Sequence, residues 1–229
     1  MKLGKRLQQI NAMISHGYEH IWDTCCDHGL LGAALLKRNA APNIHFVDIV
    51  PELIAELEVK LHKFCEKLAP TGSATTWHTQ CLDSAALRLD LYSGKHLVII
   101  AGIGGDLTQQ IITSILQNHS AIEIDFLICP VHHEYSLRQQ LIQMNCSLIN
   151  ETLVKENQRI YEILFVSTSK HAASKPIHPV GSLLWQAKCE DAIAIRQQYL
   201  KTRIQHYQRQ TRNNAAAKKA LAAYQSVLF

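Results

Sequence analysis

Short apolar runs alternate along the chain with longer segments in which apolar residues recur every three or four positions. Each short run predicts a buried strand, and each periodic segment predicts a helix. This alternation predicts a doubly wound α/β domain, in which right-handed crossovers build a parallel sheet covered by helices on both faces. The expected strand and helix pairs are 20–25 with 30–38, 44–48 with 52–67, 74–79 with 84–89, 97–101 with 107–117, and 125–129 with 135–144.

The pattern changes after residue 146. Two strand-like runs, 147–154 and 159–168, are separated only by the polar residues 155–158. This predicts a β-hairpin whose second strand lies antiparallel to the rest of the sheet. The predicted sheet therefore has seven strands, is mostly parallel and has an antiparallel last strand. By analogy at the level of the fold, this arrangement is typical of Rossmann-like class I methyltransferases.

The C-terminal segment predicts a separate helical unit. Pro176, Pro179 and Gly181 indicate a loop, and apolar residues then recur at helical spacing on both sides of a break at 212–214. Two helices joined in this way pair as an antiparallel hairpin. We therefore expect an α/β domain over residues 1–175 and a coiled-coil-like helical arm over residues 182–229.

The composition suits this organisation. With 229 residues, 47% of them hydrophobic, the chain is long enough for a full core. No apolar run reaches the roughly 18 residues that cross a bilayer, and the basic start is not followed by an apolar signal segment. The seven cysteines contain no C-x-x-C pair, and the histidines are dispersed. We expect a cytoplasmic protein with no membrane contact and no bound metal.

The net charge of +4 is unevenly distributed along the chain. From Ser182 onward there are eight Lys or Arg residues, including Lys188, against two acidic residues, whereas the preceding residues sum to −2. A basic arm on an acidic body predicts a polyanionic partner, although a solvated basic helix face has the same composition.

The first predicted strand leads into the sequence Asp23-Thr24-Cys25-Cys26-Asp27-His28-Gly29. Dinucleotide-binding folds have a G-x-G-x-x-G turn at this place, but this segment carries carboxylates instead. Asp27 would repel a diphosphate at the helix N-terminus, whereas it would not repel a cofactor with a cationic sulfonium and no phosphate. The motif favours S-adenosylmethionine (SAM) over NAD. The plainer alternatives are a helix N-cap for Asp27 and a solvated side chain for His28.

Other candidate ligands follow the later strands, because ligands of open α/β sheets bind at the carboxyl ends of the strands. Asp48 lies where an acidic residue accepts hydrogen bonds from ribose hydroxyls. Asp83 is placed to meet the amino group of an adenine ring or to cap the next helix. The glycines of 101–105 permit positive φ and close approach of a ligand. The predicted cofactor-binding residues are Asp23, Cys25, Asp48, Asp83, Ala101, Gly102, Ile103 and Gly104.

Several short motifs occur together in this chain. They are Leu3-x-x-Arg6-Leu7, Asp23-x-x-x-Asp27-His28, Ala101-Gly102-Ile103-Gly104-Gly105, His132 with Arg138 and Leu141, Tyr161-Glu162, and Val180-Gly181. In combination, and over almost the whole chain, they resemble the bacterial tRNA (adenine-22, N1) methyltransferase family. The chain departs from the family at two places. The family usually has Gly where this chain has Cys25, and Tyr-Leu-Pro where it has Leu-Leu-Gly at 30–32. The Cβ of Cys25 lies beside the path of the cofactor.

The resemblance implies SAM-dependent methyl transfer to N1 of an adenine in tRNA by in-line displacement. Adenine N1 already offers a lone pair, so proximity and orientation supply most of the acceleration. The product ring is cationic, which a nearby carboxylate favours. Asp27 is the first catalytic candidate, and His28 would orient the acceptor or assist loss of a proton. The arm would hold the phosphates of the tRNA through Arg196, Lys201, Arg203, Arg209 and Arg212. We expect the protein to be a monomer or a weak dimer.

Two other functions are compatible with the sequence. One is a non-catalytic RNA-binding module that keeps the fold, with a cofactor turn that Cys25 has disrupted. It predicts tRNA binding with a steep salt dependence and no methyl incorporation. The other is a methyltransferase that acts on a small molecule or a protein and uses the arm for dimerisation. Methyl incorporation and tRNA retention discriminate between the three hypotheses.

Overall fold

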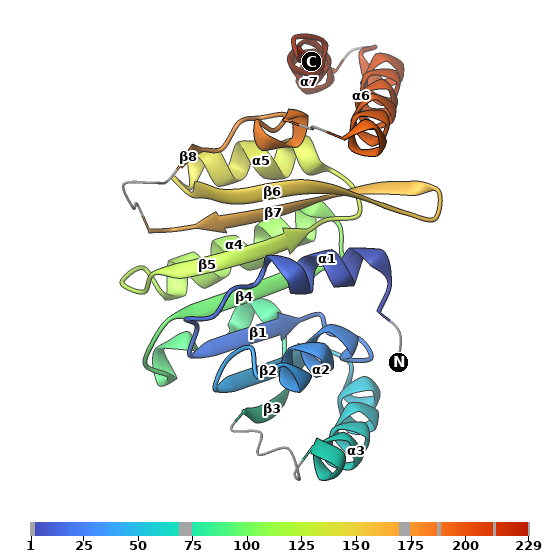
Figure 1. The fold of residues 1–229 in the computed structure, drawn as a ribbon. Coiled ribbons are helices and arrows are strands. Elements are labelled where there is room, and N and C mark those ends of the chain that lie inside the picture. The colour runs from blue at the N-terminus through green and yellow to red at the C-terminus, as the bar shows by residue number, and fades with distance from the viewer. Residues whose placement is uncertain (1–2, 69–74, 170–174, 187–188, 213, 229) are drawn as a thin grey trace.

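A computed structural model describes residues 3–68, 75–169, 175–186, 189–212 and 214–228. The chain forms one eight-stranded sheet with the order β3-β2-β1-β4-β5-β7-β6-β8 (Figure 1). The strands are β1 (His20–Thr24), β2 (Asn43–Asp48), β3 (Thr76–Cys81), β4 (His96–Ala101), β5 (Ile124–Cys129), β6 (Ser147–Glu156), β7 (Arg159–Ser167) and β8 (Lys175–Pro176).

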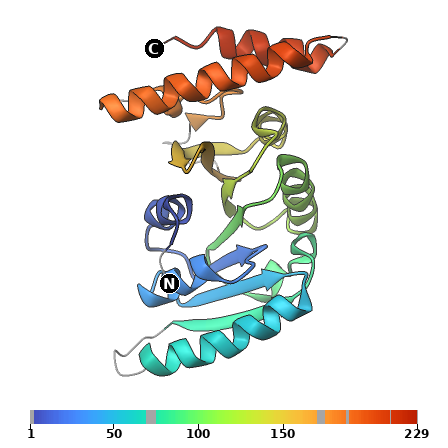
Figure 2. The ribbon, with the colours of Figure 1, turned by 90° about the vertical axis from the view of Figure 1, so that its right-hand side faces the viewer.

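Helices cover both faces of the sheet (Figure 2). Successive side chains of a strand point to opposite faces, so Ile21 packs with α1, α2 and α3, whereas Trp22 packs with α4 and α5. Because both faces are covered at the centre of the sheet, β4 and β5 are mainly apolar and buried, whereas β3 at the edge is more polar and only partly buried. The helices are α1 (Lys5–Met13), α2 (Leu30–Lys37), α3 (Pro51–Leu68), α4 (Gly105–Asn118), α5 (Glu134–Gln143), α6 (Glu190–Gln210) and α7 (Ala215–Gln225).

The strand directions confirm the predicted fold class. Strands β1 to β5 run parallel to one another, and β7 lies antiparallel between β5 and β6. The order reverses between β1 and β4, so the loops after these two strands diverge and open a crevice at their carboxyl ends. All seven predicted strands are present, and the two-residue β8 is an addition at the edge. Ala74, the expected first residue of the third strand, lies outside the described residues.

The helix predicted over 84–89 is wrong. Two single 3-10 turns, Ser84–Ala86 and Leu89–Leu91, replace it. Leu87 and Leu89 are both fully buried, and a spacing of two residues does not place side chains on one face of a helix. Helix α1, which packs Ile10 against the sheet, was not predicted from the sequence.

The two C-terminal helices pair as an antiparallel hairpin and lie on the β6–β7 end of the sheet (Figure 2). Among the described residues, no helix combines the length and apolar character needed to span a bilayer. The buried residue at the centre of α6 is Tyr199, which packs near Val180 and Tyr224. The stripe that predicted this helix did not include Tyr199; it consists of Ile193, Gln197, Leu200, Ile204 and Tyr207.

A buried charged network joins this hairpin to the sheet. Arg138 of α5 is fully buried and donates to Glu162 at 2.8 Å and to Glu151 at 2.6 Å. Burial lowers the pKa of Arg138, but the charges of the two glutamates outweigh this effect and raise it. Tyr199 donates its hydroxyl to the other oxygen of Glu162. The carboxylate of Glu162 therefore links α5, β7 and α6.

Four histidines form a row across adjacent strands at the amino end of the sheet. His45 of β2 stands beside His20 of β1 and His78 of β3, and His96 of β4 stands on the other side of His20. Nδ1 of His20 and Nε2 of His45 are 2.9 Å apart. Trp22 donates to Nδ1 of His96 at 3.2 Å, which requires an unprotonated nitrogen there. Burial lowers the pKa of each of the four histidines, so the row is built from neutral imidazoles at neutral pH.

We expect this row to make folding sensitive to acid. Burial, with the neighbouring histidines, lowers the pKa of His45 to about 3. Below pH 6.5 the unfolded chain therefore binds a proton at His45 that the folded chain does not bind. The contribution of neutral His45 to stability is complete above pH 6.5 and is lost as the pH falls. Between pH 7 and pH 5, urea unfolding should show a loss about 2 kcal/mol larger for the wild type than for His45→Phe.

The comparison between variants isolates the histidine, because other groups titrate in the same range. The matched control is His16→Gln, since His16 is exposed. It should lose as much stability between pH 7 and pH 5 as the wild type. Equal losses for the wild type and His45→Phe would contradict the role of the row.

Candidate functional site

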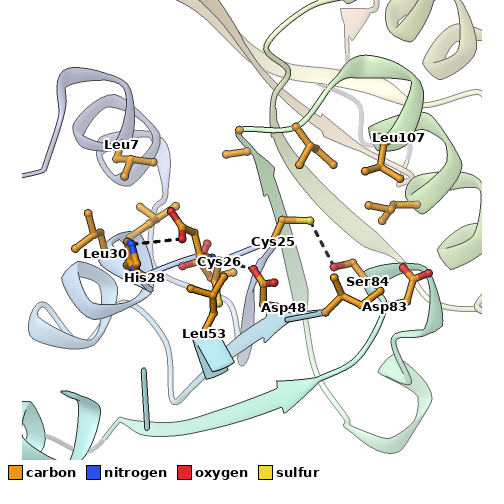
Figure 3. Close-up of a pocket in the computed structure, with 18 of the residues that line it drawn as sticks. Leu7, Cys25, Cys26, His28, Leu30, Asp48, Leu53, Asp83, Ser84 and Leu107 are labelled. Atoms are coloured by element: carbon orange, nitrogen blue, oxygen red, sulfur yellow. Dashed lines mark hydrogen bonds and ion pairs between the residues drawn. The ribbon is translucent and has the colours of Figure 1, made fainter. Parts of the chain in front are cut away.

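A crevice of about 600 Å³ opens at the carboxyl ends of β1, β2 and β4 (Figure 3). It lies where the reversal of strand order predicts a ligand site. The predicted residues that line it are Asp23, Cys25, Asp27, His28, Asp48, Asp83, Ala101, Gly102 and Ile103. Gly104 does not line the crevice. It is the N-cap of α4, and a side chain there would collide with the ring of His132.

Asp23 forms the floor of the crevice. It ends a buried strand, and its carboxylate accepts a hydrogen bond of 2.8 Å from the backbone N–H of Gly32 in α2. Burial raises the pKa of Asp23 to about 7. The hydrogen bond from Gly32 opposes this shift, and the negative charge of Asp48 adds to it. A buried carboxyl with such a pKa is costly to the fold and is typical of a functional position.

The loop between β1 and α2 is held in a strained conformation. Cys25 has φ 53° and Asp27 has φ 51°, both in the left-handed region, which costs a residue with a Cβ roughly 1–2 kcal/mol. The side chain of Cys25 points toward Ser84, 3.8 Å away (Figure 3). The family that the sequence resembles usually has Gly at this position, and the positive φ is the physical reason that Gly suits it.

We expect Cys25→Gly to stabilise the protein. The substitution removes the left-handed strain, and it costs roughly 0.5–1 kcal/mol because Gly is more flexible in the unfolded chain. The net gain in the free energy of urea unfolding should be about 0.5–1 kcal/mol. Cys25→Ala is the control, because Ala keeps the Cβ and should bring no gain. Equal stability of the two variants would contradict the strain.

Asp48 is fixed at the end of β2 by two backbone groups. Its Oδ2 accepts from the N–H of Asp27 at 3.0 Å, and its Oδ1 accepts from the N–H of Val50 at 3.1 Å. Each oxygen keeps a second acceptor site, so the carboxylate has capacity for a pair of ligand hydroxyls. The bond to Asp27 also couples Asp48 to the strained loop.

Asp83 serves as a cap and still faces the crevice. Its Oδ1 accepts from the N–H of Ala85 at 2.9 Å, which satisfies the first 3-10 turn. The side chain is exposed and belongs to the crevice lining. Both readings of this residue from the sequence are therefore compatible with its position.

Asp27 and His28 lie at the mouth of the crevice. Their side chains are 70% and 54% exposed, and the nearest oxygen of Asp27 is 3.7 Å from Nε2 of His28. Neither side chain is buried, so both can contact a second substrate that enters from solvent.

The charge of the crevice is predominantly negative. Asp23, Asp27, Asp48 and Asp83 line it, whereas Arg6 is its single Lys or Arg among the described lining residues. A diphosphate placed there would meet several carboxylates, and a sulfonium would be attracted to them. Those parts of the chain that the structure describes contain no group of three or more potential metal ligands.

Arg6 and Leu7 are lining residues that received no role from the sequence. They come from α1, whose side chains reach the crevice beside the glycine turn after β4. The guanidinium of Arg6 lies 5.1 Å from the centre of the Tyr161 ring. The spacing of Leu7, Ile10 and Met13 is a helical signal that would have indicated this helix.

The five basic residues predicted to hold RNA fall into two groups. Lys201, Arg209 and Arg212 are exposed. Arg203 is largely buried and donates to Glu134 at 2.7 Å, and Arg196 keeps one buried Nη1 atom without a hydrogen bond. Lys188 lies outside the described residues. A buried ion pair is expensive to break, so the geometry favours Arg203 as an anchor of α6 rather than as a ligand of phosphate.

Comparisons with known proteins agree with this geometry. The sequence model of the family described as "Methyltransferase domain" matches residues 3–164. No curated protein matches the chain.

Similar solved structures extend over α1 to α7 rather than over the sheet alone. An uncharacterized protein from Listeria monocytogenes is 18% identical, with a TM-score of 0.75 and full coverage of both chains. M. capricolum TrmK in complex with S-adenosyl-homocysteine is 19% identical, with a TM-score of 0.67, and the B. subtilis m1A22 tRNA methyltransferase TrmK is 20% identical, with a TM-score of 0.65. Each of these two matches covers 98% of this chain and 94% of the other. The likeness shows a shared fold.

Proposed function

Since the chain belongs to the methyltransferase domain family, we propose that it transfers the methyl group of SAM to N1 of an adenine in tRNA, adenine 22 in particular. The acidic crevice at the switch point of the sheet is the observation that carries the proposal. The full-length fold shared with the B. subtilis m1A22 tRNA methyltransferase supports the choice of substrate.

The crevice residues suit SAM in size, charge and donor set. Its volume of about 600 Å³ lies within the range of cofactor sites. Asp48 would accept from the ribose hydroxyls and Asp83 from the adenine amino group. Gly102, with φ 92°, lets the backbone after β4 approach a ligand closely. Asp23 and Cys25 would complete the wall beside the amino-acid end.

The chemistry requires little from the protein beyond position and charge. Bound SAM supplies a methyl group on a cationic sulfonium. Adenine N1 has its lone pair available, so the main task of the crevice is to hold the acceptor in line. Asp27 would stabilise the positive charge that develops on the ring. His28, 3.7 Å from Asp27, would orient the base or accept a proton.

The arm would hold the tRNA while the crevice holds the base. Adenine N1 is inaccessible in a stacked or paired base, so the target must leave the stack. Lys201, Arg209 and Arg212 present exposed cations on the hairpin for phosphates. We assign donor binding to residues 1–175 and RNA contact to residues 182–229. We infer that the protein acts on tRNA in the cytoplasm, as a monomer or weak dimer.

Nucleoside mapping by mass spectrometry tests this function. Unmodified tRNA pools are incubated with the protein and isotope-labelled SAM, digested and compared with pools that lack protein. The expected result is labelled 1-methyladenosine at one position of the tRNA. Label in another nucleoside, or none in tRNA, would contradict the proposal. tRNA retention without methyl incorporation would indicate a non-catalytic RNA-binding module.

A further inference from the structure

A second pocket, of about 390 Å³, lies between the loop after β5, the start of β7 and helix α6. The loop contributes His132, the hairpin contributes residues 158–161, and α6 contributes Gln198 and Thr202. The pocket therefore has walls from both the sheet domain and the arm. None of its lining residues lines the donor crevice.

Two contacts connect this pocket with the crevice. Arg6, which lines the crevice, lies over the ring of Tyr161, which lines the second pocket. Gly104 follows the crevice residues 101–103, and the ring of His132 occupies the space where its side chain would be. A polymer whose base enters the crevice would meet the second pocket next.

The charges of the second pocket suit a polyanion. Glu134 is its acidic lining residue, and it is neutralised by Arg203 at 2.7 Å. Arg159 is exposed at the start of β7 and forms no ion pair with any residue that the structure describes. Lys155 stands close by, with its Nζ 2.9 Å from Oε1 of Gln198. A free guanidinium thus remains at the pocket.

An aromatic ring accompanies this cation. Tyr161 is half-buried, and Arg6 holds its ring in place from the crevice side. Sites for single-stranded nucleic acid combine cations that bind the backbone with aromatic rings on which bases stack. The volume is sufficient for one nucleotide.

We propose that this pocket binds a nucleotide that flanks the methylated adenine, with the base on Tyr161 and a phosphate on Arg159. The inference rests on the proposed function for the identity of the RNA. It gives α6 a role beyond general attraction, since this helix completes the site. The pocket keeps the flanking chain in place while the target base is outside the stack.

Filter retention of unmodified tRNA at several salt concentrations tests the site without any methyl transfer. Arg159→Gln should reduce the slope of log K against log salt by about 0.7 to 0.9, the loss of one phosphate contact. Tyr161→Leu should weaken binding about tenfold, the loss of one stacked base, with little change in slope. The matched control is Lys37→Gln, an exposed cation at the end of α2, which should retain the slope of the wild type.

The outcomes separate the pocket from the proposed reaction. Arg159 is exposed at a turn, so Arg159→Gln is expected to fold normally. An unchanged salt slope for it would overturn the assignment, as would tRNA affinity of Tyr161→Leu within twofold of the wild type. If the wild type binds tRNA but transfers no methyl group, the proposed function fails while the salt slope still tests the pocket. Calorimetry with SAM should give the same affinity for Arg159→Gln and the wild type, because Arg159 does not line the crevice.

Discussion

Replacing Asp27 with Asn lowers the rate of methyl transfer to tRNA by about 10²- to 10³-fold, because the charge that stabilises the cationic ring is removed from the transition state. Asn has the same shape and tolerates the left-handed conformation that Asp27 adopts at φ 51°. The backbone N–H that holds Asp48 is unchanged. The measurement is a single-turnover rate at saturating SAM and tRNA.

The specificity of this effect is checked with a carboxylate away from the crevice. Asp90 is ion-paired with Arg88 on the surface and does not line the crevice, so Asp90→Asn should retain the rate of the wild type. SAM affinity measured by calorimetry should fall far less than the rate in Asp27→Asn, because Asp23, Asp48 and Asp83 still line the crevice. A single-turnover rate within threefold of the wild type would remove Asp27 from the chemical step.

Arg138→Met is expected to have the largest effect on stability. It leaves Glu151 and Glu162 buried without their positive partner. Removal of one partner from a buried ion pair costs about 3–5 kcal/mol. Tyr199 bonds to the same Glu162, so α6 should loosen together with the β6–β7 hairpin. Urea unfolding measures the loss, and limited proteolysis of the arm reports the loosening.

Arg88→Met is the matched control, because Arg88 forms an exposed pair with Asp90 at 2.6 Å. Solvent screens exposed pairs, so this variant should unfold almost as the wild type does. A loss below about 1 kcal/mol for Arg138→Met, no larger than that of an exposed pair, would contradict the network as the anchor of the arm.

Most of the fold was predictable because hydrophobic pattern determines it. Central strands such as β4 are mainly apolar runs, and helices such as α4 carry one apolar face, as Ile111, Ile112 and Ile115 show. β8 has only two residues, too few for any periodicity. The stripe that predicted α6 did not include Tyr199. This residue is buried because its hydroxyl donates to Glu162, as well as because its ring packs in the interior.

The position of the crevice was predictable, but its local geometry was not. The rule that ligands bind at the carboxyl ends of strands indicated Asp23, Asp48 and the glycine turn after β4. The left-handed conformation of Cys25 could not be foreseen, because residues other than Gly rarely adopt it. The partner of Arg203 is Glu134, 69 positions away, and local sequence does not show such a contact. The number of basic residues in the arm is therefore larger than the number of cations free to bind RNA, since Arg203 is ion-paired.

Calorimetry with SAM, and with NAD as the competing ligand, tests the central claim that the acidic crevice holds a sulfonium cofactor. The expected result is saturable one-to-one binding of SAM and no binding of NAD. Asp48→Ala should weaken SAM binding about tenfold or more, because hydrogen bonds to a charged acceptor are lost. Binding of NAD by the wild type, or SAM affinity that is unchanged in Asp48→Ala, would contradict this account of the crevice.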